Sequence, residues 1–275
     1  MLITSASNPR IKAIRKLRDR KYREQSASHL VEGVRAIEEG LDNAALVTTL
    51  IFNESALRES KELQHLLQRI SEIKPQPELL AVTTEVLSSF SSRSNPHLAI
   101  AVFDQRWMSL EEIKEEPNHA WIALEAPRDP GNVGTIIRTA EAAGARGVIL
   151  LDQSCDPYSP EAMRASTGAL FGISLVKSTR DTFIAWAKQS AFELVGTGLA
   201  RSQDYRELPY TAPTIIVMGT EKDGITDTLE NACDFMAKIP MRGKTDSLNL
   251  SIASGLMLFE VMNRKATYQN NSINT

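Results

Sequence analysis

Cysteine and histidine are scarce in this sequence and are nowhere grouped. The 275 residues include two cysteines, Cys155 and Cys233, which form no metal-binding or redox spacing. The four histidines match no metal or catalytic-triad spacing: His29, His65, His97 and His119. These absences predict reduced, packed thiols and a protein that needs no metal.

Long apolar runs are absent as well, and a secretory leader is not expected. No apolar run is long enough to span a bilayer, and residues 1–5 lack the charged and apolar regions of a secretory leader. With 42% hydrophobic and 24% charged residues, the composition is that of a globular protein, which we expect to be cytoplasmic. A chain of this length can bury a sizeable core and is expected to form two domains.

Positive charge is concentrated near the N-terminus, although the net charge of the chain is −3. Eight basic residues and a single acidic residue, Asp19, lie between Arg10 and Arg23. Asn8-Pro9 starts a predicted helix here, with an N-cap and a proline in the first turn. Because the basic residues are almost unrelieved by acidic ones, the run favours a polyanionic partner over a merely solvated helix face.

The first hundred residues alternate between strands and helices. The predicted strands are Leu30–Val31, Leu46–Phe52, Leu79–Val82 and Leu98–Phe103. The predicted helices are Gly33–Asp42, Arg58–Ile73 and a short one between the last two strands. This alternation predicts a small α/β domain over residues 1–104, followed by a polar linker over 105–118.

The alternation is stronger in a second predicted domain, residues 119–265. Its predicted strands are Ala120–Leu124, Val148–Leu151, Ile173–Val176, Phe192–Val195, Thr214–Met218 and Phe235–Ile239. Its predicted helices are Val133–Ala143, Ser159–Ala169, Asp181–Gln189, Thr226–Asn231 and Leu248–Arg264. This order predicts an α/β fold with a mostly parallel sheet and helices on both faces, and the polar residues 266–275 are a predicted disordered tail.

Three polar stretches follow predicted strands, where ligands bind in parallel sheets. Residues 239–251 combine a strand end, a glycine loop and a helix start, for which Ser247 is the predicted N-cap. Residues 125–134 open a helix that Asn132 can cap and that carries Arg138. Residues 219–224 form a loop with two glycines. Neither of the last two loops has a G-x-G-x-x-G or G-K-[ST] fingerprint, which argues against an ordinary dinucleotide-binding enzyme.

Together the three stretches resemble the three motifs of the SpoU (TrmH) family of RNA ribose 2′-O-methyltransferases, within the SPOUT superfamily. Residues 129–134 with Arg138-Thr139-Ala140 resemble motif one, and Gly219-Thr220-Glu221 resembles motif two. Residues 239–241 with 247–251 resemble motif three. The resemblance implies a SPOUT trefoil-knot methyltransferase domain. The N-terminal half is similar to the small ribosomal-protein-like substrate-binding domain that precedes this domain in many members.

The resemblance also implies the cofactor and the site. S-adenosylmethionine is the expected cofactor, near Thr197, Gly219, Ile239, Met241 and Leu248. The family's polar set falls on five residues that are all present: Asn132, Arg138, Glu221, Ser247 and Asn249. We expect Arg138 to orient the ribose hydroxyl as a cation, because arginine does not readily lose its proton. Ser247 and Asn249 would position that hydroxyl, and Glu221 would orient Arg138.

RNA, most consistently 23S ribosomal RNA, is the substrate that the resemblance implies, and a symmetric homodimer through the C-terminal domain is the implied assembly. The residues expected to bind RNA are Arg10, Arg15, Lys16, Arg18, Arg20 and Arg23. Two alternatives stay open at this point. One is a tRNA ribose methyltransferase, and the other is a non-catalytic knotted RNA-binding protein that acts in ribosome assembly.

Overall fold

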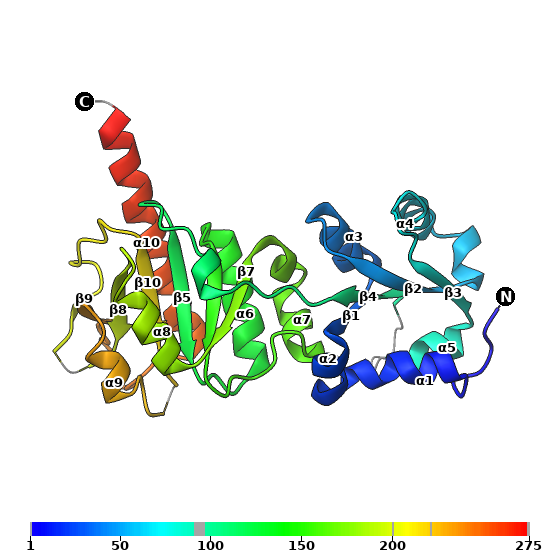
Figure 1. Cartoon of the computed structure of the whole chain (residues 1–275), viewed down its shortest axis with the longest axis horizontal. Helices are drawn as coiled ribbons and strands as arrows, with labels where there is room; N and C mark the ends of the chain where they lie inside the picture. Colours follow the sequence, from blue (N-terminus) through cyan, green and yellow to red (C-terminus); the bar gives the residue numbers. More distant parts are fainter. Residues whose placement is uncertain (1, 91–96, 200, 221, 274–275) are drawn as a thin grey trace. The chain divides into compact units, whose positions relative to one another are not determined.

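The computed structural model describes residues 2–90, 97–199, 201–220 and 222–273, with side chains as far as residue 267. The chain divides into two compact units, shown in Figure 1. The N-terminal unit contains residues 1–106 and 158–171. The C-terminal unit contains residues 107–157 and 172–275. Residues 158–171 therefore fold with the N-terminal unit, although the sequence placed them within the second domain.

A four-stranded mixed sheet forms the centre of the N-terminal unit. Its strands are β1 (Ser28–Glu32), β2 (Val47–Asn53), β3 (Glu78–Val82) and β4 (Ala99–Asp104). The order is β1-β4-β2-β3, with β4 antiparallel to both neighbours and β3 parallel to β2. The helices that follow these strands are α3 (Val34–Asp42), α4 (Lys61–Ser71) and α5 (Thr84–Ser88). All four predicted strands are present.

The basic N-terminal segment is not one continuous helix. It consists of α1 (Pro9–Arg15), a 3-10 turn (Lys16–Arg18) and α2 (Arg20–Ser26). Asn8 caps α1 as predicted, because its side chain accepts the N–H of Arg10 at 2.9 Å. Asp19 has extended backbone angles (φ −93°, ψ 134°), which interrupt the helix. Ile11 and Leu17 are buried in a core with Ile51, so the basic side chains occupy the outer faces.

The segment 158–171 is attached to the N-terminal unit by aromatic contacts. It contains α7 (Pro160–Ser166), which Ser159 caps by accepting the N–H of Ala162 at 3.2 Å. The ring of the fully buried His29 lies 4.6 Å from that of Tyr158 and about 6 Å from those of Phe171 and Phe103, between ring centroids. A neutral imidazole suits this apolar box, and burial lowers the pKa of His29 to about 3.

The C-terminal unit is built on seven strands, all paired in parallel. They are β5 (Ala120–Glu125), β6 (Gly147–Leu151), β7 (Ser174–Ser178), β8 (Glu193–Thr197), β9 (Gln203–Asp204), β10 (Thr214–Met218) and β11 (Phe235–Lys238). Their order is β7-β6-β5-β10-β8-β11-β9. The six predicted strands are present, which confirms the predicted parallel sheet, and only the two-residue β9 was not predicted. The strands are buried along most of their length, as expected for a sheet covered on both faces.

Helices cover this sheet, and the segment that precedes β5 contributes to its core. The helices are α6 (Pro130–Ala143), α8 (Arg180–Ala187), α9 (Asp227–Glu230) and α10 (Leu250–Ile273). Helix α10 packs against α6, β5 and β10. It runs beyond the predicted end near Arg264, so residues 266–273 continue the helix where the sequence suggested disorder. Leu110 and Ile113, within the predicted linker, are buried in the core of this unit.

Burial of His29 predicts a pH-dependent stability. Between about pH 6.5 and pH 3 the unfolded chain binds a proton at His29 that the folded chain does not. The stability that depends on the neutral ring is therefore complete above pH 6.5 and is lost as the pH falls toward 3. Each pH unit in this window should cost up to about 1.4 kcal/mol of the free energy of unfolding.

Urea denaturation at pH 7.5, 6.0 and 5.0 measures this effect. His29→Phe should flatten the pH dependence, because the ring stays aromatic but no longer titrates. The matched control is His65→Gln, which removes an exposed histidine paired with Glu38. If His29→Phe and wild type lose stability in parallel, burial of His29 does not explain the acid sensitivity.

Candidate functional site

The three polar stretches emerge at one edge of the C-terminal sheet. Because β5, β8, β10 and β11 run parallel, the loops that follow them begin at the same edge. A cavity of about 430 Å³ lies among the last three of these loops and the start of α10. Its lining residues include Gly198, Met218, Gly219, Thr220, Gly224, Ile225, Ile239, Asp246, Ser247, Leu248 and Leu250.

The residues predicted to surround a cofactor all line this one cavity. They are Thr197, Gly219, Ile239, Met241 and Leu248. The hydroxyl of Thr197 is held by donating to the carbonyl oxygen of Val217 at 3.2 Å. Sequence reasoning had not included Asp246, Gly224 and Leu250, which also line it. They lie in or directly beside the same three stretches as the predicted residues, so their position in the sequence could have indicated them.

The loop after β10 is a tight turn that requires glycine. A Cβ at Gly219 would lie 1.9 Å from the backbone of Gly224, so no larger residue fits there. Thr220 and Gly224 exchange two backbone hydrogen bonds, of 3.1 and 3.0 Å. Gly224 has φ +68°, in the left-handed region that favours glycine. The turn itself therefore restricts this position to glycine, and Gly219 also lines the cavity. Glu221, predicted to orient Arg138, lies outside the described residues.

Asn249, not Ser247, is the residue that caps α10. The helix begins at Leu250. The Asn249 carbonyl oxygen accepts the N–H of Ala253 at 3.0 Å, and its Oδ1 accepts the N–H and the hydroxyl of Ser251 at 2.9 and 2.6 Å. The predicted cap at Ser247 is therefore wrong by two residues. Ser247 is an exposed loop residue that lines the cavity.

Asp129, not Asn132, caps α6. Oδ1 of Asp129 accepts the N–H of Asn132 at 2.6 Å, and Pro130 follows the cap. This is the pattern of an N-cap followed by proline that correctly identified the start of α1, so the sequence contained the signal. The cap at Asp129 leaves the side chain of Asn132 for another contact. Its Oδ1 accepts from Nδ2 of Asn249 at 3.0 Å, which joins motif one to motif three.

Of the described residues of the predicted polar set, Ser247 lines the cavity, whereas Asn132, Asn249 and Arg138 do not. Around Arg138, the flanking residues Ile136, Ile137 and Ala140 are buried, whereas Arg138 itself is exposed. It is absent from the cavity lining and makes no ion pair or hydrogen bond with any described residue. The chain thus joins Asn132 to Asn249 and places Ser247 at the cavity wall, whereas Arg138 lies further along α6 than Asn132.

The cavity suits an amphipathic small molecule. Its volume lies at the lower end of the range for small-molecule sites. Apolar side chains such as Met218, Ile225 and Leu250 make up much of the wall. Asp223 and Asp246 add carboxylates that can favour a cation. This combination fits S-adenosylmethionine, which has an aromatic base, polar groups and a positively charged sulfonium.

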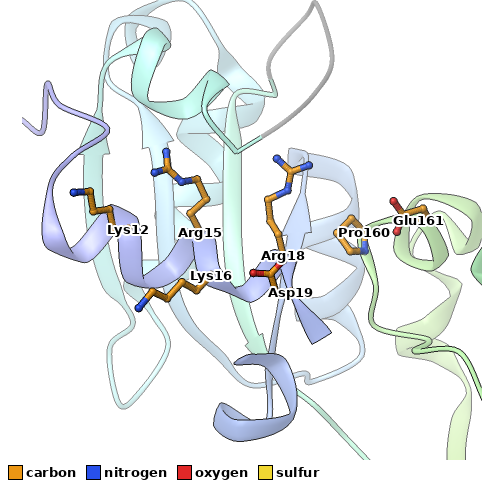
Figure 2. A pocket seen from close by; sticks show the side chains of 7 residues that line it. All are labelled: Lys12, Arg15, Lys16, Arg18, Asp19, Pro160 and Glu161. Carbon is orange, nitrogen blue, oxygen red and sulfur yellow. The ribbon is translucent and has the colours of Figure 1, made fainter. Parts of the chain in front are cut away.

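A second hollow lies within the N-terminal unit and is basic. It measures about 630 Å³ and is lined by Lys12, Arg15, Lys16, Arg18, Asp19, Pro160 and Glu161. Figure 2 shows the guanidinium groups of Arg15 and Arg18 on the same side of the helical segment, with Pro160 and Glu161 of α7 beyond Arg18. We call this hollow the basic groove. Arg15, Lys16 and Arg18 were among the residues expected to bind RNA, whereas Lys12 was predicted only as part of the basic run.

The other predicted basic residues are engaged elsewhere. Arg10 pairs with Glu78, and Arg20 pairs with Glu24 at 2.8 Å. Arg23 is only 3% exposed, and its Nη1 donates to the carbonyl oxygens of Leu17 and Arg18 at 2.7 and 2.6 Å. The prediction that Arg23 belongs to the exposed basic surface is therefore wrong, because it holds the turn between α1 and α2.

Comparison with known proteins agrees with this architecture. The model of the SpoU rRNA methylase family matches residues 119–259, and that of an MRM3-like substrate-binding domain matches residues 8–101. A 23S rRNA (uridine(2479)-2′-O)-methyltransferase of Streptomyces viridochromogenes is 30% identical over 90% of this chain and 87% of its own length. A 23S rRNA (guanosine(2553)-2′-O)-methyltransferase of Bacillus subtilis is 26% identical, covering 94% and 98%.

Solved structures show the same similarity. An S-adenosylmethionine-bound rRNA methyltransferase from Sinorhizobium meliloti superimposes with a TM-score of 0.89 at 35% identity, covering 96% of this chain and 97% of the other. The SpoU methyltransferase AviRb from Streptomyces viridochromogenes, also with the cofactor, superimposes with a TM-score of 0.85 at 29% identity, covering 94% and 99%.

The fold and the site define a methyltransferase of the parallel-sheet SPOUT type with a separate substrate-binding domain. The chain belongs to the SpoU rRNA methylase family. Its reaction is S-adenosylmethionine-dependent methylation of an RNA ribose 2′-hydroxyl, which confirms the predicted reaction class and cofactor. None of the described helices combines the length and apolar character that a membrane crossing needs.

The bond between Asn132 and Asn249 generates a prediction that separates capping from catalysis. Asn249→Ser keeps a side-chain oxygen at the cap of α10, so the free energy of unfolding should change by less than about 1 kcal/mol. A serine hydroxyl is too short to reach Asn132 as the amide does. We therefore expect methyl transfer to fall by roughly a hundredfold or more while S-adenosylmethionine affinity is retained.

Single-turnover methylation, isothermal titration and thermal melts measure the three quantities. The matched control is Asn8→Ser, which makes the same replacement at the cap of α1 in the other unit. Methylation by Asn249→Ser at a near wild-type rate would assign Asn249 to helix capping alone.

Proposed function

We propose that this chain methylates the ribose 2′-hydroxyl of one nucleotide in 23S ribosomal RNA. The observation that carries the proposal is the junction of the three motifs, where the pair Asn132–Asn249 lies at the helix start beside the 430 Å³ cavity. Both curated relatives described above are named for this reaction on 23S rRNA. A substrate of this kind also supports the expected cytoplasmic location, where bacterial ribosomes are made.

S-adenosylmethionine is held in the cavity by the loops after β8, β10 and β11. Thr197, Gly219, Ile239, Met241 and Leu248 line its walls. When bound, the cofactor supplies a methyl group on a positively charged sulfur. The protein contributes a water-poor wall of apolar side chains and a fixed orientation for the reacting oxygen.

The polar residues position and polarise the ribose hydroxyl. Asn249 is held on both sides, by Ser251 of its own helix and by Asn132 of α6, so its amide has a defined direction. Ser247 lies at the cavity wall and adds a hydroxyl. Arg138 acts as a cation that favours the ionised form of the ribose oxygen, because a guanidinium keeps its proton. Glu221 orients Arg138 in this scheme.

A homodimer explains how Arg138 reaches an active site. Helix α10 exposes three large apolar side chains, Ile252, Leu256 and Phe259. They line a shallow groove with Thr135 and Thr139 of α6, beside the exposed Arg138. Burying this apolar strip against a second copy would remove it from water. Under a two-fold axis each copy then brings its Arg138 to the cavity of its partner.

The basic groove binds the RNA backbone. Lys12, Arg15 and Arg18 form no ion pair with any described residue, so their charges are available for phosphates. Phosphate contacts supply affinity and position the RNA, but they do not specify its sequence. The groove therefore contributes to binding in the N-terminal unit, and the chemistry takes place at the cavity of the C-terminal unit.

Methylation of purified RNA tests the substrate. The enzyme should transfer one methyl group to 23S rRNA isolated from a strain that lacks the gene, and mapping of ribose methylation should identify a single nucleotide. The same RNA from wild-type cells, already modified, is the control and should accept none. Transfer to tRNA instead of 23S rRNA would replace the proposed substrate by the tRNA alternative.

Mixing two inactive variants tests the shared active site. Arg138→Ala lacks the cation, and Gly219→Val blocks the turn at the cavity, so each homodimer should be inactive. A mixed dimer has one intact site, made of one copy's cavity and the other copy's Arg138. Equal amounts, mixed and refolded together, should regain about a quarter of wild-type activity by random pairing. No recovery, in variants that still dimerise by light scattering, would mean that Arg138 acts within its own chain.

Neutralising the groove tests RNA binding. Changing Lys12, Arg15 and Arg18 together to glutamine should weaken RNA binding and reduce the slope of log Kd against log salt by about three. Saturating RNA should restore the single-turnover rate, since these residues do not touch the reacting groups. The control changes Arg10, Arg20 and Arg69, which are paired with carboxylates, and should reduce affinity less. A rate that stays low at saturating RNA would assign the groove to the chemical step.

A further inference from the structure

Glu125 is a buried carboxylate at the edge of the sheet where the motif loops begin. It is the last residue of β5 and is only 5% exposed. The pairing of β5 with β10 ends one residue earlier, at Leu124 opposite Met218. Beyond that pair the two segments are no longer paired: Glu125 leads into motif one, and Gly219 leads into motif two. A charged side chain is costly at such a buried position unless every acceptor is used.

Both oxygens of Glu125 bind the end of the motif-two loop. Oε2 accepts the N–H of Thr226 at 2.8 Å, and Oε1 accepts its hydroxyl at 2.9 Å. Thr226 is the residue before α9 and directly follows Ile225, which lines the cavity. Up to Met218, backbone hydrogen bonds connect β5 with β10. Beyond it, the carboxylate of Glu125 connects the end of β5 with the segment that follows β10.

Arg180 holds Glu125 in this position. Its Nη1 donates to Oε1 of Glu125 at 3.2 Å and lies 3.3 Å from the hydroxyl oxygen of Thr226. The backbone N–H of Arg180 is itself bound by Oδ1 of Asp152, the residue after β6, at 2.9 Å. The bond to Glu125 is the main cause that raises the pKa of Arg180. Glu125, Arg180 and Asp152 therefore connect the ends of β5, β6 and β7 with one another and, through Thr226, with the end of the motif-two loop.

We propose that Glu125 is a positioning residue for S-adenosylmethionine binding, acting through Thr226 on the turn that Thr220 and Gly224 close with their two backbone hydrogen bonds. The inference rests on the proposed function, because it needs the cofactor to occupy the cavity that this turn lines. The tight turn at Gly219 and Gly224 has one end on β10, and Glu125 fixes the other end. Without that anchor the turn can open away from the cavity wall, which weakens cofactor binding more than it slows the methyl transfer of bound cofactor.

The test uses the full-length chain and S-adenosylmethionine itself. Glu125→Gln preserves the size of the side chain but removes its charge and replaces one acceptor oxygen by a donor. The Kd for S-adenosylmethionine, measured by isothermal titration without RNA and well below the melting temperature, should rise roughly tenfold or more. The KM for the cofactor should rise with it, while kcat at saturating cofactor stays within about threefold of wild type.

A second carboxylate in the same sheet provides the matched control. Glu193 starts β8 at the opposite edge and is partly buried, and burial raises its pKa. Glu193→Gln makes the same chemical change away from the loops, so the Kd should stay within about twofold of wild type. If Glu125→Gln lowers the melting temperature but leaves the Kd unchanged, Glu125 only stabilises the fold and the inference is wrong.

A pair of variants at Thr226 keeps the test decisive if Glu125→Gln does not fold. Thr226→Val removes the hydroxyl and keeps the shape, so the Kd should rise, whereas Thr226→Ser keeps both bonds and should bind as wild type does. Equal affinity in the two variants would overturn the inference. If the wild-type enzyme methylates RNA and these variants bind the cofactor normally, the inference fails but the proposed function stands. If the wild type binds no S-adenosylmethionine, the inference and the proposed function both fail.

Discussion

The parallel pairing of β5 with β10 is the constraint on which the site depends. Parallel strands end at the same edge of a sheet, so the loops that follow Leu124 and Met218 must begin side by side. Motif one and motif two are separated by about ninety residues in the sequence, yet this pairing brings their first residues together. An antiparallel pair would have placed them at opposite edges. The third motif joins them because β11 is parallel to β8, and β8 is parallel to β10.

Helix capping in this site fixes the amide side chains of Asn132 and Asn249. Asp129 satisfies the first turn of α6, which leaves the side chain of Asn132 available. Asn249 uses its oxygen to cap α10 and its nitrogen to bind Asn132. The two helix starts are therefore connected by a hydrogen bond between side chains. A cap normally contributes only local stability, but here its geometry also sets the direction of the amide beside the cavity.

Pairing within the N-terminal unit determines which of the clustered basic side chains have no carboxylate or carbonyl partner among the described residues. The basic segment loses three of its eight cations to specific partners, since Arg10 and Arg20 bind carboxylates and Arg23 binds carbonyl oxygens. The cations that remain around the groove include Arg15 and Arg18. They lie beside α7 because residues 158–171, which follow β6 in the sequence, fold with the N-terminal unit. An acidic chain can in this way present a compact basic surface to a polyanion.

The sequence by itself determined the elements and the chemistry of the loops. Apolar runs that alternate with helical patterns predicted ten of the eleven strands found among the described residues, because this signal is local. The order and spacing of the three motifs identified the family. Only the tertiary structure decided which of two neighbouring polar residues caps a helix, as at Asn249, and which arginine is buried, as at Arg23. It also decided that residues 158–171 pack with the N-terminal unit. The packing of 158–171 on His29 and the bond from Asn249 to Asn132 join residues far apart in the sequence, which local preference cannot predict. At Arg23 the partners are close in the sequence, but the carbonyl oxygens of Leu17 and Arg18 are brought to it only by the folded turn.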